Sequence, residues 1–270
     1  MRNQDLLPLD TATLGSLAVI GPNATPAVIQ GGGSAQVGAH YTVSPLEGIR
    51  ARSGDEVDIV YEPGCLIHKT LPALDQRWAT LPGGEPGLEV EYFSGFELAG
   101  EPVLRKRVRD GSFFWFGDFS PEVDVNAFSA RMIADFTPDQ DGSFGFSLTS
   151  AGKTRMRVDG REVIDNWTQQ SRGEAFFGVG STEVCAEIEL EAGRVYRIEV
   201  DYSREDSPLV AGCKIGCVPP IPDDMLERAV SAAGQADAAV VVVGLNGEWE
   251  GEGGDRVSYR LPGRQEELIE

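Results

Sequence analysis

The middle of the chain alternates apolar and polar residues, and this alternation constrains the fold more than any other feature of the sequence. A period of two places one side of each β-strand in a core and the other side in solvent. Asp159 and Gly160 add a strong hairpin-turn signal. Strands that recur between turns predict an antiparallel sandwich or barrel over residues 86–207. The clearest alternating segments are residues 128–136, 144–148, 184–190 and 196–202.

The segment before this alternation has a different pattern. Residues 17–20 are a short, fully apolar run, typical of a strand buried on both faces of a parallel sheet. Ser44 as the N-cap and Pro45 in the first turn predict a helix start. Residues 57–61 predict a second strand. This order of strand, helix and strand indicates a parallel α/β unit.

The α/β pattern returns after the alternating segment. A helix signal and another apolar run are followed by a second helix signal at residues 261–269. Because the chain stops there, we expect this last helix to have nothing to pack on. We therefore predict a partial, discontinuous α/β sandwich made of residues 1–81 and 209–270. An all-β sandwich domain, residues 86–207, is inserted into it.

The net charge of −20, with only 23 Lys and Arg residues, disfavours two classes of partner. Nucleic acids and anionic membrane surfaces both bind through clustered basic residues. No apolar run reaches membrane-spanning length. Residues 1–5 show no signal-peptide core, which slightly favours a cytoplasmic location. A neutral ligand such as a sugar is not disfavoured by this charge, and a homo-oligomer stays open.

Residue types that bind metals and cofactors are sparse. The chain has four cysteines, no CxxC pair and two histidines, so we expect buried free thiols and no zinc site. The stretch GGGSA at residues 31–35 lacks the Lys-Ser/Thr of a phosphate-binding loop, and a tight turn facing the active site is the better interpretation. We expect no cofactor.

Three glutamates, Glu248, Glu250 and Glu252, are crowded into the segment that follows the apolar run at residues 238–243. Loops at the carboxyl ends of parallel strands are where such folds place their sites. Carboxyl groups can act as general acids and bases, and one that acts as an acid must hold its proton near neutral pH. Spacing alone favours a solvated acidic loop, so a catalytic interpretation depends on similarity to a known family.

Five stretches, in this order, resemble the C-terminal α/β-sandwich domain of family 3 glycoside hydrolases. The resemblance implies a retaining, β-glucosidase-like hydrolase that cleaves terminal non-reducing β-glucosyl residues from β-glucosides or oligosaccharides. The family's nucleophile is an aspartate of an N-terminal barrel, which this chain lacks, and residues 2–9 resemble the segment just after that barrel. We therefore expect a fragment that is inactive alone and whose partner is the missing barrel domain. The stretches are LAVIGPN, GGGSA, SPLEGI, VGLNGEWEGEGGDR and LPG, at residues 17–23, 31–35, 44–49, 243–256 and 261–263.

The same resemblance assigns roles to the glutamate-rich segment. The family's acid/base is the Glu of the Glu-Gly pair before Asp-Arg, which matches Glu252, and Glu250 is the second choice. Asp255 and Arg256 are expected to form an ion pair that shapes the loop. They are also expected substrate contacts, and Trp249 is expected either to stack on the sugar or to pack against the protein.

The middle domain resembles a PA14 domain in two stretches, FGFSLTS at residues 144–150 and VDGREVIDNW at residues 158–167. PA14 domains are β-sandwiches often tied to carbohydrate binding. A stand-alone carbohydrate-binding module without catalysis is therefore the alternative function. Some PA14 domains hold calcium with adjacent aspartates, but Ser150, Ala151 and Gly152 occupy the matching place here, so we expect binding without calcium.

Four consecutive aromatics, FFWF at residues 113–116, stand out in the β domain. Alternation predicts that two of them are buried and two are exposed. We expect the exposed pair to contact a glycan or lie against the catalytic cleft, and we assign Trp115 to substrate binding. For Trp167, a core position beside a hydrogen-bonding turn is the favoured interpretation.

Overall fold

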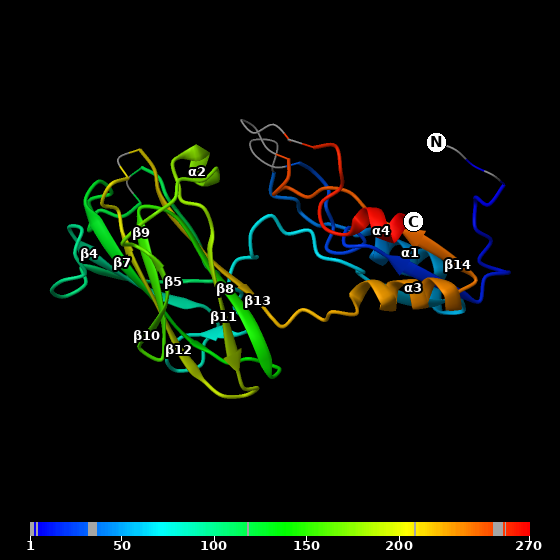
Figure 1. Cartoon of the computed structure of the whole chain (residues 1–270), viewed down its shortest axis with the longest axis horizontal. Coiled ribbons are helices and arrows are strands. Elements are labelled where there is room, and N and C mark those ends of the chain that lie inside the picture. Colours follow the sequence, from blue (N-terminus) through cyan, green and yellow to red (C-terminus); the bar gives the residue numbers. More distant parts are fainter. Residues whose placement is uncertain are drawn as a thin grey trace. The chain divides into compact units, whose positions relative to one another are not determined.

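The structure is a computed structural model, and it describes residues 3, 5–31, 37–117, 119–207, 209–250, 256 and 258–270. It divides into two compact units. The first, the α/β unit, comprises Met1–Lys69 and Pro222–Glu270, and the second, the β unit, comprises Thr70–Ile221. Figure 1 shows helices beside a short sheet in the first unit and long strands in the second.

The α/β unit is built on a three-stranded parallel sheet in the order β14-β1-β2. Strand β1 pairs along its length with both neighbours, so its backbone polar groups are satisfied within the sheet. This agrees with the predicted parallel unit. The elements are β1 (Ser16–Ile20), α1 (Pro45–Ser53), η2 (Gly54–Glu56), β2 (Asp58–Glu62), α3 (Met225–Gln235), β14 (Ala238–Val241) and α4 (Gln265–Ile269).

Alternate side chains of β1 enter two apolar clusters on opposite faces of the sheet. Leu17 and Val19 pack with Leu46 of α1 on one face. Ala18 and Ile20 pack with the helix α3 and with Leu268 of α4 on the other. The expectation that the last helix has nothing to pack on is therefore wrong, because Leu268 supplies its contact with the sheet.

Helix α1 begins where the sequence predicted. The Ser44 hydroxyl accepts a hydrogen bond from the backbone N–H of Glu47 at 3.2 Å, and the Glu47 carboxylate accepts one from the N–H of Ser44 at 2.7 Å. This capping box satisfies two N–H groups at the helix start. The bond from the Ser44 backbone also holds the pKa of Glu47 below its ordinary value.

The β unit consists of two antiparallel sheets around one shared core. One sheet has the order β10-β9-β12-β7-β4-β5, with β3 paired to β7, and the other has the order β11-β8-β13-β6. Aromatic and aliphatic side chains from both sheets form a single buried cluster. The elements are β3 (Ala79–Thr80), β4 (Leu88–Ser94), β5 (Leu104–Val108), β6 (Ser112–Trp115), β7 (Phe128–Phe136), β8 (Gly142–Ala151), β9 (Lys153–Val158), β10 (Arg161–Asn166), α2 (Ala175–Gly178), β11 (Val184–Leu190), β12 (Tyr196–Ser203) and β13 (Ala211–Val218).

The unit boundaries differ from the predicted residues 81, 86, 207 and 209. Strand β13 belongs to the β unit, since it pairs with β8 on one side and with β6 on the other. Ala211, Cys213, Ile215 and Cys217 of this strand are all buried. Their alternation with glycines and a lysine is the same period-two pattern, but small residues make it weak in the sequence. None of the helices in the described part of the chain is long and apolar enough to cross a membrane.

Candidate functional site

The candidate site lies at the carboxyl edge of the parallel sheet, where the segments after β14, β1 and β2 meet. The segment after β1 and the segment after β14 are tied by a hydrogen bond from Asn23 Nδ2 to the carbonyl of Leu245, at 2.8 Å. Gly21 allows them to approach, because a Cβ there would overlap the carbonyl of Val242 and its φ of 112° favours glycine. Such an edge is where parallel sheets place ligands.

A buried glutamine fixes Gly244, the residue before Leu245 in the segment after β14. The side chain of Gln265, at the start of α4, accepts a hydrogen bond from the N–H of Gly244 at 2.7 Å and donates one to its carbonyl at 2.9 Å. Gln265 also donates to the carbonyl of Pro262 at 2.9 Å. These bonds fix the path of the backbone from β14 into the segment that carries the glutamates.

Residues 246–256 are called the carboxylate loop from here on, and residues 246–250 and 256 of it are described. The loop starts with a turn in which the Asn246 side chain accepts from the N–H of Glu248 at 3.0 Å, while its carbonyl accepts from the N–H of Trp249 at 3.0 Å. The Trp249 ring then donates to the carbonyl of Ile67 at 2.6 Å. This first part of the loop is thereby held to the segment after β2.

Two of the glutamates in the loop have different surroundings. Glu248 accepts a hydrogen bond from the backbone N–H of Lys69 at 2.8 Å, and its carboxylate lies 3.8 Å from Nδ1 of His68. Glu250 is exposed. A Cβ added to Gly31 would lie 3.9 Å from Oε2 of Glu250, so this carboxylate faces the start of the glycine-rich stretch.

The structure brings together only some of the predicted site residues. Glu250 and Trp249 lie in the described part of the carboxylate loop, at the edge of the sheet. Glu252 and Asp255, and with them the expected ion pair to Arg256, lie outside the described residues, as do residues 32–36 of the glycine-rich stretch. Arg256 is exposed and donates to the carbonyl of Arg260 at 3.0 Å.

The assignment of Trp115 to substrate binding is wrong. Its side chain is only 6% exposed, and its ring N–H donates to the hydroxyl of Tyr92 at 3.1 Å inside the core. The predicted alternation is confirmed, because Phe113 is buried as well while Phe114 and Phe116 are exposed. Trp115 faces inward because its strand β6 pairs with β13, whose buried face covers the same core.

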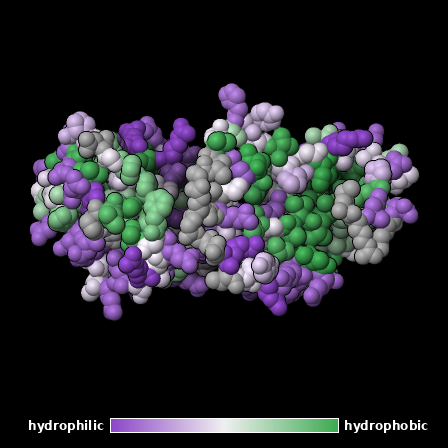
Figure 2. All heavy atoms as spheres, turned by 90° about the horizontal axis from the view of Figure 1, so that it is seen from above, coloured by the Kyte–Doolittle hydropathy of each residue, from purple (hydrophilic) through white to green (hydrophobic). Residues whose placement is uncertain are grey.

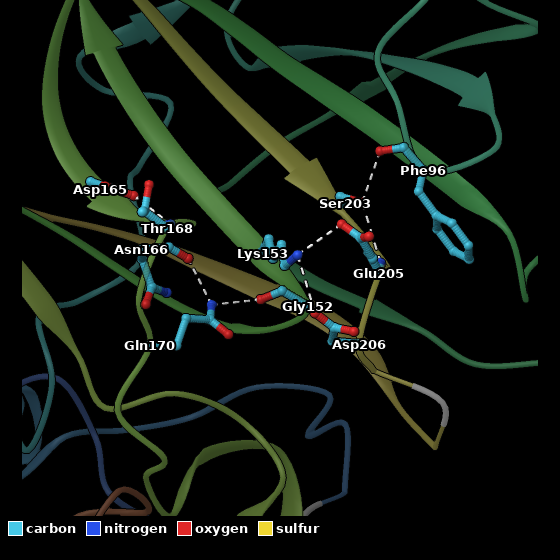
Figure 3. A network of polar contacts seen from close by, with 10 residues as sticks. All are labelled: Phe96, Gly152, Lys153, Asp165, Asn166, Thr168, Gln170, Ser203, Glu205 and Asp206. Atoms are coloured by element: carbon cyan, nitrogen blue, oxygen red, sulfur yellow. Dashed lines mark hydrogen bonds and ion pairs between the residues drawn. The ribbon is translucent and has the colours of Figure 1, made fainter.

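Figure 3 shows the turn at Gly152. This is the place that would match the calcium-binding aspartates of some PA14 domains. The Gln170 amide donates to the carbonyl of Gly152 at 2.9 Å and to the carbonyl of Asn166 at 2.7 Å. The ammonium of Lys153 pairs with Glu205 at 2.8 Å. Across the described residues, His, Cys, Asp and Glu side chains form no group of three or more that could hold a metal ion.

Trp167, for which a core position was favoured, is half-buried, and the guanidinium of Arg155 lies 4.9 Å from the centre of its ring. The predicted turn beside it is confirmed, since the Asp165 carboxylate accepts hydrogen bonds from the N–H groups of Trp167 and Thr168 at 2.8 and 2.9 Å. These two bonds hold the pKa of Asp165 below its ordinary value. Three of the four free cysteines are buried as expected, but Cys185 is exposed.

Sequence reasoning missed the residues that hold the carboxylate loop. Asn23 and Gln265 both lie inside stretches that were singled out, but neither carries a charge or a nucleophile. Ile67 and Lys69 bind the loop through backbone atoms, which leave no signal in residue type, although the Lys69 ammonium also lies 5.9 Å from the centre of the Trp249 ring. Gln265 alone had a usable signal, since it directly follows the LPGR turn and is a polar residue at a helix start.

Comparison with known proteins identifies relatives over the whole chain. The model of the glycosyl hydrolase family 3 C-terminal domain matches residues 1–270. A β-glucosidase of Rhizobium radiobacter is 39% identical, covering 100% of this chain and 32% of the relative. Probable beta-glucosidase J of Aspergillus fumigatus is 35% identical, covering 99% of this chain and 33% of the relative.

One solved structure extends the comparison to the fold. The β-glucosidase of Kluyveromyces marxianus, crystallised in complex with glucose, superimposes with a TM-score of 0.84 at 31% identity. The match covers 99% of this chain and 33% of that protein. The chain therefore spans about a third of the length of these relatives.

Proposed function

We propose that this chain, which belongs to the glycosyl hydrolase family 3 C-terminal domain family, supplies the acid/base loop of a retaining, β-glucosidase-like hydrolase. The substrate is a β-glucoside or oligosaccharide with a terminal non-reducing β-glucosyl residue. The observation that carries the proposal is the carboxylate loop, held at the carboxyl edge of the sheet by the hydrogen bond from Trp249 to Ile67. Relatives named β-glucosidases support the substrate class.

The chemistry requires a second carboxyl group. A retaining glycosidase places its nucleophile and its acid/base about 5–5.5 Å apart. In this proposal the nucleophile is an aspartate of an N-terminal barrel outside the chain, so the chain alone is inactive. Release of p-nitrophenol from an aryl β-glucoside by the purified chain, abolished by Glu252→Gln, would contradict this.

Within the loop, Glu252 is the proposed acid/base and Glu250 the second choice. The exposed carboxylate of Glu250, facing Gly31, supports a ligand-facing role for this part of the loop. Asp255 and Arg256 are proposed to shape the loop and contact the substrate. The ring face of Trp249 is proposed as a further sugar contact.

The test uses leaving groups in the intact enzyme, with the barrel present. A phenol of low pKa departs without protonation, so Glu252→Ala should slow formation of the glycosyl-enzyme from such an aryl glucoside very little. A sugar leaving group needs the proton, and its cleavage should slow by about 10²–10⁴-fold. Azide needs no base and should restore turnover with a β-glycosyl azide product. Glu250→Ala, the matched control, should show neither effect.

The opposite pattern decides against the assignment. If Glu250→Ala shows leaving-group dependence and azide rescue while Glu252→Ala shows neither, the acid/base is Glu250. If neither variant shows them, the acid/base lies outside the carboxylate loop.

Exposed apolar surface on the α/β unit supports the proposal that an N-terminal barrel is the partner of this chain. On the face drawn in Figure 2, hydrophobic residues gather over this unit. Several large hydrophobic residues between β1 and α1 are exposed, and contiguous exposed apolar surface marks interaction sites. We propose that part of this surface contacts the barrel. The exposed residues in this segment include Val28, Ile29, Val37, Tyr41 and Val43.

A second candidate function, carbohydrate binding by a PA14-like domain, is favoured by an aromatic surface on the β unit. The Phe114 ring is nearly parallel to the rings of Phe116 and Phe176, with centres 6.1 and 6.5 Å apart. Phe116 and Phe177 are 78% and 84% exposed. Phe176 and Phe177 also have φ values of 51° and 60°, a strained conformation that is common at functional sites.

This candidate predicts weak sugar binding that needs no calcium. Titration with cello-oligosaccharides, followed by NMR with and without a chelator, should give the same shifts, and Phe177→Ala should remove them. Tight binding that disappears on chelation would contradict the calcium-free proposal.

A further inference from the structure

Two neighbouring side chains of the carboxylate loop point toward the same tripeptide. Trp249 donates through its ring N–H to the carbonyl of Ile67 at 2.6 Å, and Glu248 accepts the backbone N–H of Lys69 at 2.8 Å. His68 stands between Ile67 and Lys69 in the sequence, and its Nδ1 lies 3.8 Å from Glu248 Oε2. The loop is thereby bound at both ends of residues 67–69, the last residues before the β unit begins at Thr70.

The two bonds have complementary directions. The tryptophan is a donor only, and the ionised carboxylate is an acceptor only. A hydrogen bond from an N–H group to a carboxylate is charge-assisted and stronger than a neutral one. The Glu248 side chain is 30% exposed, so this bond is partly shielded from competing water.

The sequence of the loop is rich in glycine. Gly247 precedes the anchored pair, and Gly251, Gly253 and Gly254 follow it. Glycine has the largest backbone freedom to lose on ordering. Glu248 and Trp249 therefore provide side-chain bonds to residues 67–69 that the glycines of this segment cannot provide.

We propose that Glu248 and Trp249 are positioning residues, which hold the carboxylate loop on residues 67–69 and so fix the glutamates that follow. Glu248 is thereby distinguished from Glu250 and Glu252, although the three are close in sequence. The inference rests on the proposed function for its effect on catalysis. The anchoring itself is a property of this chain alone.

The anchoring is tested in the chain by amide hydrogen exchange. Glu248→Ala removes the acceptor of the Lys69 N–H, so exchange at Lys69 should accelerate by at least tenfold. Glu248→Gln keeps an acceptor oxygen without the charge and should retain most of the protection. Glu56→Ala, which removes an exposed carboxylate at the amino-terminal end of β2, is the control and should leave exchange at Lys69 unchanged.

The effect on catalysis is measured in the intact enzyme with the barrel present. A displacement of about 1 Å in a catalytic group can cost about 10²-fold in rate. Because a displaced acid/base transfers protons poorly, Glu248→Ala should lower kcat for a sugar leaving group by about 10- to 100-fold, slow glycosyl-enzyme formation from an aryl glucoside much less, allow partial azide rescue and leave KM little changed. Glu248→Gln should recover most of the lost kcat. Rates are expressed per active site, counted with a 2-fluoro glucoside that traps the glycosyl-enzyme.

Several results would overturn the proposal. Leaving-group dependence and azide rescue as strong in Glu248→Gln as in Glu248→Ala would make Glu248 the acid/base, because the amide keeps the acceptor oxygen but cannot act as the acid. A lower fraction of active sites with unchanged kcat per site would reduce its role to general stability. Unchanged exchange at Lys69 would remove the anchor. If Glu248→Ala does not fold, Trp249→Phe, which keeps an aromatic ring but removes the N–H donor with the rest of the indole, should give the same loss for sugar leaving groups, and a wild-type kcat would refute the inference.

Failure of the proposed function is recognised separately. In that case neither Glu250→Ala nor Glu252→Ala shows leaving-group dependence, whereas exchange at Lys69 still responds to Glu248→Ala.

Discussion

The side-chain amide of Gln265 binds both backbone polar groups of Gly244, with its oxygen 2.7 Å from the N–H nitrogen and its nitrogen 2.9 Å from the carbonyl oxygen. It replaces the neighbouring strand that would otherwise satisfy these groups just after β14. Gln265 is fully buried. One side chain thus connects the start of α4 to the segment that leads into the carboxylate loop.

We expect Gln265→Leu to destabilise the α/β unit. The change keeps the volume of the side chain but leaves the polar groups of Gly244 and the carbonyl of Pro262 without their partner. Since an unsatisfied buried polar group costs about 1–3 kcal/mol, we expect a loss of about 2–3 kcal/mol for the set. Urea unfolding measures it. Gln235→Leu, an exposed glutamine on α3, is the control, and an equal effect of both changes would contradict this account.

Asp201 on β12 is the buried centre of an ion cluster on the large sheet of the β unit. Its carboxylate accepts hydrogen bonds from Arg131 at 2.8 Å, Arg155 at 3.0 Å and Arg157 at 2.8 Å. Burial by itself acts to raise the pKa of Asp201, but the hydrogen bonds and charges of these arginines outweigh it and hold the pKa below its ordinary value. Register places Arg155 and Arg131 directly opposite Asp201 on the two neighbouring strands.

Asp201→Asn should destabilise the β unit at neutral pH. Breaking a buried ion pair costs about 3–5 kcal/mol, and because the arginines keep part of their hydration we expect about 2 kcal/mol here. A lowered carboxyl pKa adds stability above the unfolded pKa, which is lost as pH falls through the folded pKa. The difference between wild type and variant should therefore shrink below about pH 4.

The measurement is urea unfolding at pH 7 and at pH 3. Asp135→Asn, which removes a partly exposed carboxylate paired with Arg197 on the same sheet, is the control and should cost less than half as much. A difference between Asp201→Asn and wild type that grows toward pH 3 would have the wrong sign for this account.

The boundaries of the β unit predict which segment folds alone. Residues 70–221 contain every strand of both sheets, so we expect a cooperative thermal transition and dispersed NMR signals. Residues 86–207 lack β3 and β13. Without β13, strand β6 loses its partner, and the core loses the side chains of Ala211, Cys213, Ile215 and Cys217. A folded, cooperative segment 86–207 would show that β13 is dispensable.

Thiol labelling should distinguish the four cysteines. Cys185 is exposed, whereas Cys65, Cys213 and Cys217 are buried. Burial raises the pKa of Cys217 to about 12, which further suppresses its thiolate. We expect one thiol of the native chain to react with a disulfide reagent and three more to react only in denaturant. In Cys185→Ser the native reaction should vanish, and a remaining fast thiol would indicate that a buried site opens.

The alternating segments of the sequence were sufficient to predict most of the β unit, because a period of two depends only on local backbone geometry. The same local logic located β1, the Ser44 cap of α1 and the carboxylate loop after β14. It failed for β13, whose glycines and small side chains give little contrast between its two faces. For residues 113–116 it gave two buried and two exposed aromatics, but which pair faces inward follows from the sheet that β6 joins.

Patterns along the chain were enough to indicate the family resemblance, the order of the segments and the residues able to carry acid/base chemistry. The contacts that hold these residues in place become visible only in the folded chain. Trp249 and Ile67 are 182 positions apart, and Glu248 and Lys69 are 179 apart. In both pairs one partner is a backbone group, a carbonyl or an N–H, which every residue type except proline provides, so no pattern of side chains along the chain can indicate that these atoms meet.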